Sequence, residues 1–203
     1  MKYINTVTVI IFATLIFSCQ NKKDKLEKSD PRIIKIDLDK KLETKGIEDI
    51  ASSITYLVLE EDEKYPIGIV DKILITKTNI YILDSNKSRS LYIYDREGKL
   101  KKTIHDVGYA PGEFISPDDF DILETSNTMA ILDQTQRKLL YYSQNGDYIS
   151  EINLKRKNFF VNDFSFLNDN NIVLDKGNTG SDKYLEIIEN NGHKKADLLD
   201  VPQ

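Results

Sequence analysis

Acidic side chains gather at one point of this 203-residue chain, where Asp118, Asp119 and Asp121 follow Pro117. Carboxylates this close together could bind Ca²⁺ or a cationic ligand, because hard cations prefer oxygen ligands. The alternative is structural, since aspartates in loops accept backbone N–H groups and cap turns. We favour the structural interpretation, with Asp119 entering a strand, and keep the three aspartates as the candidate metal ligands.

Other chemistry-bearing residues are scarce. His105 and His193 each lack a cysteine or a second histidine at metal-ligand spacing, so we expect both on the surface. The sequence contains no Gly-x-Ser-x-Gly elbow, phosphate loop, dinucleotide fingerprint or zinc pattern. It therefore predicts no catalytic residue and no cofactor, and it favours a protein that is not an enzyme.

The single cysteine, Cys19, follows an N-terminal export-like segment. Lys2 precedes an uncharged, mostly apolar run from Val7 to Phe17, which is too short to span a bilayer comfortably. Ile16-Phe17-Ser18-Cys19 resembles a lipobox, although Phe17 is bulkier than the usual small residue. We predict that residues 1–18 are a signal peptide and that Cys19 is lipidated, anchoring the chain in a membrane.

Residues 19–31 are predicted to form a flexible tether, because they are polar, charged and without periodicity. We expect a cell-envelope protein on the outer membrane of a Gram-negative bacterium. The formal net charge of −5 argues against a nucleic-acid partner, which requires clustered positive charge.

The body of the chain repeats one pattern of short β-type runs. A Leu-Asp pair recurs at Leu83-Asp84, Leu132-Asp133 and Leu174-Asp175, with spacings of 49 and 42 residues. A further run follows each pair and ends in a glycine turn, and two of these turns are Asn-Gly, which favours a type I′ hairpin. We expect each aspartate to accept backbone N–H bonds in the next turn.

A period near 45 residues with four strands per unit is typical of β-propeller blades. The sequence therefore predicts an all-β, partial or open propeller with about three four-stranded antiparallel blades, at 69–114, 115–158 and 159–203. Tyrosines on the third strands are expected to pack between blades: Tyr92, Tyr94, Tyr141 and Tyr142.

Residues 32–68 are predicted to hold entry strands before the first blade. Arg32 to Asp39 alternates apolar and polar residues, and Ile54 to Leu59 is a second β-type run. Lys45 to Ser53 has a faint helical pattern between them. The body thus spans residues 32–203.

The first repeat resembles the six-bladed, NHL-like β-propeller lipoproteins common in Bacteroidetes. The residues that carry this resemblance are Gly108-x-x-Pro-Gly-Glu-Phe114, with Pro117 and Asp119, and the strand at 80–84. Ser52 to Glu60 is similar to the entry strand of that group. Such a fold needs about six units, so the three counted here suggest an N-terminal portion of a longer protein.

We therefore expect a lipoprotein whose propeller is a binding or scaffold module for an unknown protein or glycan. One alternative is a propeller enzyme, such as a metal-dependent lactonase or a lyase, because propellers carry many functions. Another is a non-functional, truncated propeller. Open blade edges also predict self-association.

Overall fold

The computed structural model describes residues 46, 51–154, 160–176 and 183–200. Cys19, the signal peptide, the tether and the strand expected at Arg32 to Asp39 lie outside the described residues, as does most of the faint helical pattern before Ser53. All of the strands described below belong to the unit Ile54–Gln203. Within the described residues, no helix is both long and apolar enough to cross a membrane.

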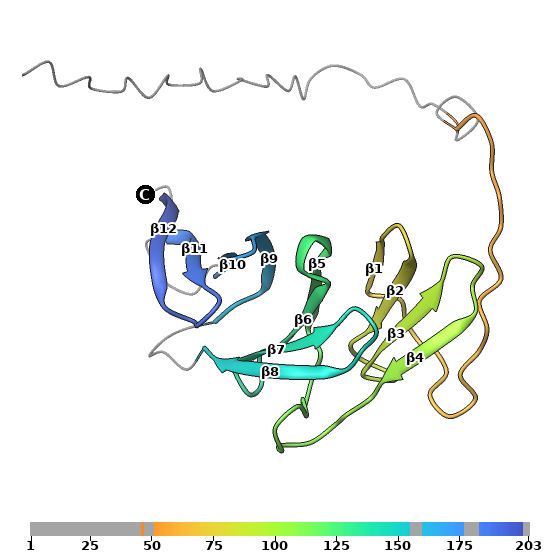
Figure 1. The fold of residues 1–203 in the computed structure, drawn as a ribbon, viewed down its shortest axis with the longest axis horizontal. Helices are drawn as coiled ribbons and strands as arrows, with labels where there is room; N and C mark the ends of the chain where they lie inside the picture. The colour runs from red at the N-terminus through yellow and green to blue at the C-terminus, as the bar shows by residue number, and fades with distance from the viewer. Residues whose placement is uncertain (1–45, 47–50, 155–159, 177–182, 201–203) are drawn as a thin grey trace, which may run out of the picture. The chain divides into compact units, whose positions relative to one another are not determined.

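Twelve strands form three separate four-stranded antiparallel sheets, as the sequence predicted, and each sheet follows the chain order (Figure 1). Blade 1 contains β1 (Lys72–Ile75), β2 (Asn79–Asp84), β3 (Ser90–Asp95) and β4 (Leu100–Ile104). Blade 2 contains β5 (Asp119–Leu123), a 3₁₀ turn η2 (Glu124–Ser126), β6 (Thr128–Asp133), β7 (Lys138–Ser143) and β8 (Tyr148–Asn153). Blade 3 contains β9 (Asp163–Asn168), β10 (Asn171–Asp175), β11 (Lys183–Glu189) and β12 (Lys194–Asp200).

The first strands of the blades lie next to one another. Strand β5 lies against β9, and β1 lies against β5 (Figure 1). This is how blades are arranged in a β-propeller, with the first strand of each blade at the inner edge. The described sheets do not close into a ring, so this part of the chain is an open, partial propeller.

Apolar cores fill the spaces between blades. Blades 1 and 2 share a cluster that includes Tyr81, Phe120 and Tyr142, all of them fully buried. Blades 2 and 3 share another, which includes Leu132, Phe164 and Leu174. Each sheet therefore buries a face against its neighbour, which a single blade cannot do alone.

The face of blade 1 turned away from blade 2 is covered in part by the chain that precedes it. Leu59 and Ile67 pack against a cluster that contains Tyr92 and Tyr94. The Tyr92 hydroxyl also donates a hydrogen bond of 2.8 Å to the backbone oxygen of Tyr65. These two tyrosines are thus buried as predicted, but under this covering segment rather than under another blade.

The strand expected at Ile54 to Leu59 is wrong. These residues belong to no sheet, and the Tyr56 side chain is 93% exposed. The described segment makes one backbone bond to blade 1, from Glu60 N to Gly98 O at 2.9 Å. A run of residues that favour β structure does not make a strand unless a neighbouring strand pairs with it. Ala51 to Ser53, the described end of the predicted helical stretch, is not helical either.

The glycine turns differ from the predicted type I′ hairpins. Gly98, Gly146 and Gly192 have φ between +85° and +87°, whereas Asn145 and Asn191 are not among the described residues with positive φ. In each turn the glycine N–H donates to the residue three positions earlier, and the ladder then shifts register. This is a type I turn followed by a glycine bulge, which requires only one left-handed residue.

The third Leu-Asp pair is out of register with the other two. Strands β2 and β6 reach Leu-Asp at their fifth and sixth residues, but β10 reaches it one residue earlier. Asp118 N donates to Leu132 O in blade 2, and the matching bond in blade 3 runs from Asn162 N to Asp175 O. Asp175 therefore holds the position of Leu132, and Lys176 holds that of Asp133. The turn that follows Asp175 lies outside the described residues, so the expectation that Asp175 caps it stays a prediction.

Candidate functional site

Three charged residues occupy equivalent positions on the inner strands of the three blades. Lys72 on β1 pairs with Leu83, Asp119 on β5 pairs with Leu132, and Asp163 on β9 pairs with Asp175. Since Asp175 is the counterpart of Leu83 and Leu132, the three positions match. Because the inner strands lie side by side, the blades bring these side chains together at one edge. We call Lys72, Asp119 and Asp163 the inner-edge cluster.

Asp119 is the centre of this cluster. Its Oδ1 lies 2.7 Å from Lys72 Nζ, and its Oδ2 accepts a 3.1 Å bond from Phe164 N in blade 3. Lys72 Nζ is also 4.0 Å from Asp163 Oδ1 and 5.6 Å from the centre of the Phe120 ring. The Asp119 carboxylate of blade 2 thus bonds to both neighbouring blades.

Asp119 and Asp163 differ in burial. The Asp119 side chain is 7% exposed and that of Asp163 is 61% exposed. Desolvation, followed by a hydrogen bond with Asp163, raises the pKa of Asp119 to about 7, although Lys72 opposes this rise. The same hydrogen bond lowers the pKa of Asp163. Below the raised pKa of Asp119 the pair therefore holds one proton, mainly on the buried Asp119, and Asp163 carries the negative charge.

A cavity of about 340 Å³ opens beside the cluster. Its charged lining consists of Lys72, Asp163 and Asp175, and Phe164, Val173 and Leu185 supply apolar surface. Two carboxylates against one ammonium leave this lining with a net negative charge. The arrangement suits a cationic group better than an anion.

Asp118 and Asp121, which the sequence offered as metal ligands together with Asp119, accept hydrogen bonds from different groups. Asp118 accepts bonds from Ser116 Oγ and Gln134 N, within blade 2 and its entry loop. Asp121 accepts bonds from Ser165 Oγ and Phe166 N at 2.8 Å each, and so fastens blade 2 to blade 3. Among the described residues, no group of three His, Cys, Asp or Glu side chains is placed to hold a metal ion. Asp118 and Asp121 thus accept hydrogen bonds that hold blade 2 to its entry loop and to blade 3.

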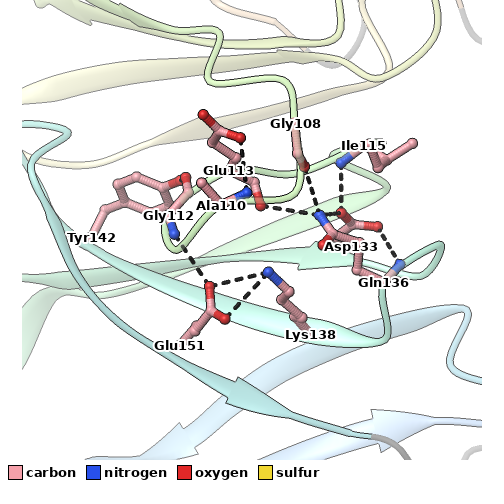
Figure 2. A network of polar contacts seen from close by, with 10 residues as sticks. All are labelled: Gly108, Ala110, Gly112, Glu113, Ile115, Asp133, Gln136, Lys138, Tyr142 and Glu151. Carbon is pink, nitrogen blue, oxygen red and sulfur yellow. Dashed lines mark hydrogen bonds and ion pairs between the residues drawn. The ribbon is translucent and has the colours of Figure 1, made fainter.

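The Gly108 to Phe114 loop joins blade 1 to blade 2, as predicted. Gln136 Nε2 donates to the backbone oxygens of Gly108 and Glu113, and Gly112 N donates to Glu151 (Figure 2). Within the loop, the Glu113 carboxylate accepts the Ala110 N–H. The polar groups of the loop are thus bound to the loop itself and to blade 2, which makes it a structural joint.

Two of the Leu-Asp aspartates cap their turns as expected. Asp84 accepts bonds of 2.8 to 3.0 Å from Gly68, Ile69 and Lys87 N–H groups. Burial raises its pKa, but these backbone donors outweigh burial and hold the pKa at about 2. Asp133 likewise accepts bonds from Ile115 N and from both nitrogens of Gln136.

The histidines lie in different surroundings. His193 is exposed, as predicted, whereas His105 is half-buried and stacks on Tyr65 with ring centres 3.9 Å apart. Its Nδ1 is 3.0 Å from Ser90 Oγ. The expectation of a surface residue is wrong for His105, because the covering segment that contains Tyr65 packs over it.

Sequence reasoning found Asp119 but missed Lys72 and Asp163. Lys72 and Asp163 each stand 12 residues before the aspartate of their Leu-Asp pair, whereas Asp119 stands 14 residues before Asp133. Alignment on the Leu-Asp pairs therefore places Asp119 out of line with the other two. A charged residue near the start of each first strand was the available signal.

The architecture is that of a β-propeller segment with a charged inner edge. The chain belongs to the family described as "Domain of unknown function (DUF4934)", whose model matches residues 33–203. A comparison with curated proteins finds no match.

Among the solved structures that resemble this chain, the first described here shares its fold. A protein of Bacteroides fragilis that is described as exported is 23% identical, with a TM-score of 0.62, and the match covers 74% of this chain and 43% of that one. Hydrazine synthase of Kuenenia stuttgartiensis is 12% identical, with a TM-score of 0.44 and coverage of 61% and 33%. The Dos1 propeller is 11% identical, with a TM-score of 0.43 and coverage of 68% and 39%. The matched part is less than half the length of each of these structures.

Proposed function

We propose that this chain is an envelope lipoprotein whose propeller blades bind a cationic group at the inner-edge cluster. The group is an amine, or the side chain of a lysine or arginine on a partner protein. The observation that carries the binding proposal is the partly exposed Asp163, which lies with Asp175 in a cavity of net negative lining. The Lys72–Asp119 ion pair beside it fixes the wall of this cavity.

The envelope address rests on the N-terminal sequence. Lys2, the apolar run from Val7 to Phe17, and Cys19 after Ser18 have the order of a lipoprotein signal. The description of the Bacteroides fragilis structure as exported agrees with this address. We propose that the mature chain belongs to a six-bladed propeller held at the outer membrane by lipid on Cys19.

The address is tested by the variant Cys19→Ala. We expect it to lose metabolic labelling by fatty acid and to leave the membrane fraction. Unchanged labelling would remove the basis for the lipid anchor. The matched control is Ser18→Ala, which keeps a small residue before the cysteine and should be labelled normally.

The binding proposal is tested by titrating the ¹⁵N-labelled protein with 1,4-diaminobutane. We expect amide shifts at Ser165 and Val173, which line the cavity. Asp163→Asn should abolish them, because it removes the exposed negative charge at constant shape. Asp147→Asn is the control, since Asp147 is a 74%-exposed carboxylate paired with Lys102 elsewhere. Equal binding by Asp163→Asn and the unmutated chain would contradict the proposal.

We also propose that the protein self-associates through the open face of blade 3. The apolar side chains of this face that lie outside the cation cavity are half-buried or exposed, and among the described residues no strand packs over them: Ile187, Ala196 and Leu198. Contiguous apolar surface of this kind favours association between proteins.

A further inference from the structure

A second cavity lies where the covering segment meets blade 1, and we propose that it binds the phosphate group of a small, soluble phosphate monoester. Its volume is about 460 Å³, within the range of small-molecule sites. Part of its wall comes from residues 64–68, and the rest from the β2–β3 turn and the residue that follows β4. The side chains that carry the argument are Lys64, Tyr65, Lys87 and His105, together with the bare backbone of Gly68.

The charge of this lining is opposite to that of the cavity beside the inner-edge cluster. Lys64 and Lys87 are both exposed, and neither forms an ion pair with a residue that the structure describes. Among the described residues that line the cavity, none is an aspartate or a glutamate. The two ammonium groups therefore give the lining a positive charge, which favours an anion.

Two carboxylates near the cavity are bound by other groups. Asp84 is fully buried, and its oxygens accept the N–H groups of Gly68 and Lys87 at 2.8 Å each. Asp62 accepts a 2.6 Å bond from Thr103 Oγ1, and its other oxygen accepts two backbone N–H groups. These bonds occupy both carboxylates and hold the covering segment to blade 1, so the cavity is formed before any ligand arrives.

The aromatic part of the wall is also fixed in place. Ser90 Oγ donates to Ser88 O at 3.0 Å, so it accepts the bond from His105 Nδ1. This bond orients the imidazole ring, on which Tyr65 stacks. Lys64 Nζ lies 4.9 Å from the centre of the Tyr65 ring, where cation–π attraction favours the ammonium. The stacked rings thus help to place the first of the two positive charges.

Gly68 lets the second lysine lie against the covering segment. A Cβ on residue 68 would lie 2.6 Å from Lys87 Cβ and 3.0 Å from Lys87 Cγ, which is too close for either pair of atoms. The stem of Lys87 therefore occupies the space that any other residue at position 68 would fill. One lysine comes from the covering segment and the other from blade 1, so an anion in the cavity is attracted to both.

The two lysines favour a phosphate over a carboxylate. A phosphate monoester carries about −1.5 to −2 charges at neutral pH, whereas a carboxylate carries one. A lysine ammonium binds phosphate as a compact charge and does not require the planar geometry by which arginine recognises a carboxylate. Among the described lining residues, none is an arginine. Two separate ammonium groups therefore suit a small group that carries both negative charges.

The experiment titrates the ¹⁵N-labelled protein with glycerol 3-phosphate at neutral pH, and with sodium acetate at matched ionic strength. We expect saturating amide shifts at Tyr65, Ser88 and His105 with the phosphate ester, and smaller shifts with acetate. Lys64→Gln and Lys87→Gln should each weaken phosphate binding about threefold, the effect of one exposed charge. Lys77→Gln is the control, because Lys77 is an exposed lysine between β1 and β2 that does not line this cavity.

Three results would overturn the proposal: no saturating shift at the cavity with glycerol 3-phosphate, equal shifts with acetate, or an equal loss of affinity in Lys77→Gln and Lys87→Gln. All three substitutions replace exposed side chains, so amides elsewhere in the spectrum should keep their positions and show that the fold is intact. The outcome is independent of the cation site, because Asp163→Asn should bind the phosphate ester as the unmutated chain does.

Discussion

The Lys72 ammonium lies 2.7 Å from the Asp119 carboxylate and joins the first strands of blades 1 and 2. The same carboxylate accepts Phe164 N from blade 3. Blade packing at the inner edge and the charge of the cavity thus depend on one side chain. A change in the protonation of Asp119 is expected to affect both.

The first prediction concerns pH. Asp119 has a pKa of about 7 in the folded protein against 3.8 for an ordinary aspartate. The folded chain therefore binds more protons than the unfolded chain in this interval, and stability falls as pH rises from 3.8 to about 7. We expect a loss of about 2 kcal/mol over this interval, less than the full shift implies, because the partly exposed Lys72 and Asp163 let solvent screen the site. The lowered pKa of Asp163 acts below 3.8, outside this interval.

The measurement is the melting temperature of the unmutated chain and of Asp119→Asn across this pH range. Asparagine has no carboxyl to titrate, so the variant should show the flatter profile. Asp147→Asn, which removes an exposed carboxylate, should keep the slope of the unmutated chain. Parallel profiles for all three proteins would show that Asp119 titrates normally.

The second prediction concerns the turn aspartates. Asp84→Ala and Asp133→Ala should each lower the free energy of unfolding by about 2 kcal/mol, because each leaves several partly buried backbone N–H groups without their acceptor. Asp147→Ala should cost less, since Asp147 is a 74%-exposed carboxylate in a surface ion pair with Lys102. Urea unfolding of the three variants checks this order. Equal losses would mean that the two turns do not depend on their aspartates.

The third prediction compares one turn in three blades. A Cβ at Gly98 would lie 2.3 Å from Val58 O, one at Gly146 would lie 3.0 Å from Ile93 Cδ1, and one at Gly192 would have nothing nearer than 3.7 Å. Substitution by alanine costs about 1–2 kcal/mol at each because of the positive φ. The clash adds to this cost most at Gly98, where the neighbour is backbone. We expect stability to fall in the order Gly98→Ala, Gly146→Ala, Gly192→Ala, with the largest loss first.

Thermal unfolding of the three glycine variants gives the order directly. The shared turn type makes Gly192→Ala the internal control for backbone strain. If Gly98→Ala were no worse than Gly192→Ala, the covering segment would not lie against the first blade.

The fourth prediction concerns self-association. Leu198, 40% exposed on the open face of blade 3, is changed to lysine. A charge on this apolar face should shift the protein towards monomer in sedimentation velocity. Tyr109→Lys alters a 78%-exposed side chain in the joint loop and should leave the distribution unchanged. A compact monomer before any mutation would contradict the proposed association.

Much of the fold follows from local sequence. The strand Asn79–Asp84 agrees with the strand expected at 80–84, because a turn signal follows it. Tyr142 packs between blades 1 and 2, and Tyr141 between blades 2 and 3, as expected. Periodicity and turn chemistry act over a few residues, and a single sequence displays them directly.

The register of blade 3 and the inner-edge cluster did not follow from the sequence. The Leu-Asp motif appears in β10 one residue earlier than in β2 and β6, so these two residues occupy different positions in the sheet of blade 3. Lys72, Asp119 and Asp163 are far apart in the chain and meet only because three blades pack side by side. Packing between repeats determines such a cluster, and the repeat period alone does not reveal it.

The most direct test of the inner-edge cluster is the carboxyl pKa of Asp119, measured by ¹³C NMR with and without 1,4-diaminobutane. We predict a pKa near 7 in the free protein, set by burial and by the hydrogen bond with Asp163. We predict a lower pKa with the amine present, because a cation beside the pair favours loss of the shared proton. An Asp119 that titrates near 3.8 and does not respond to the amine would contradict the proposed cation site.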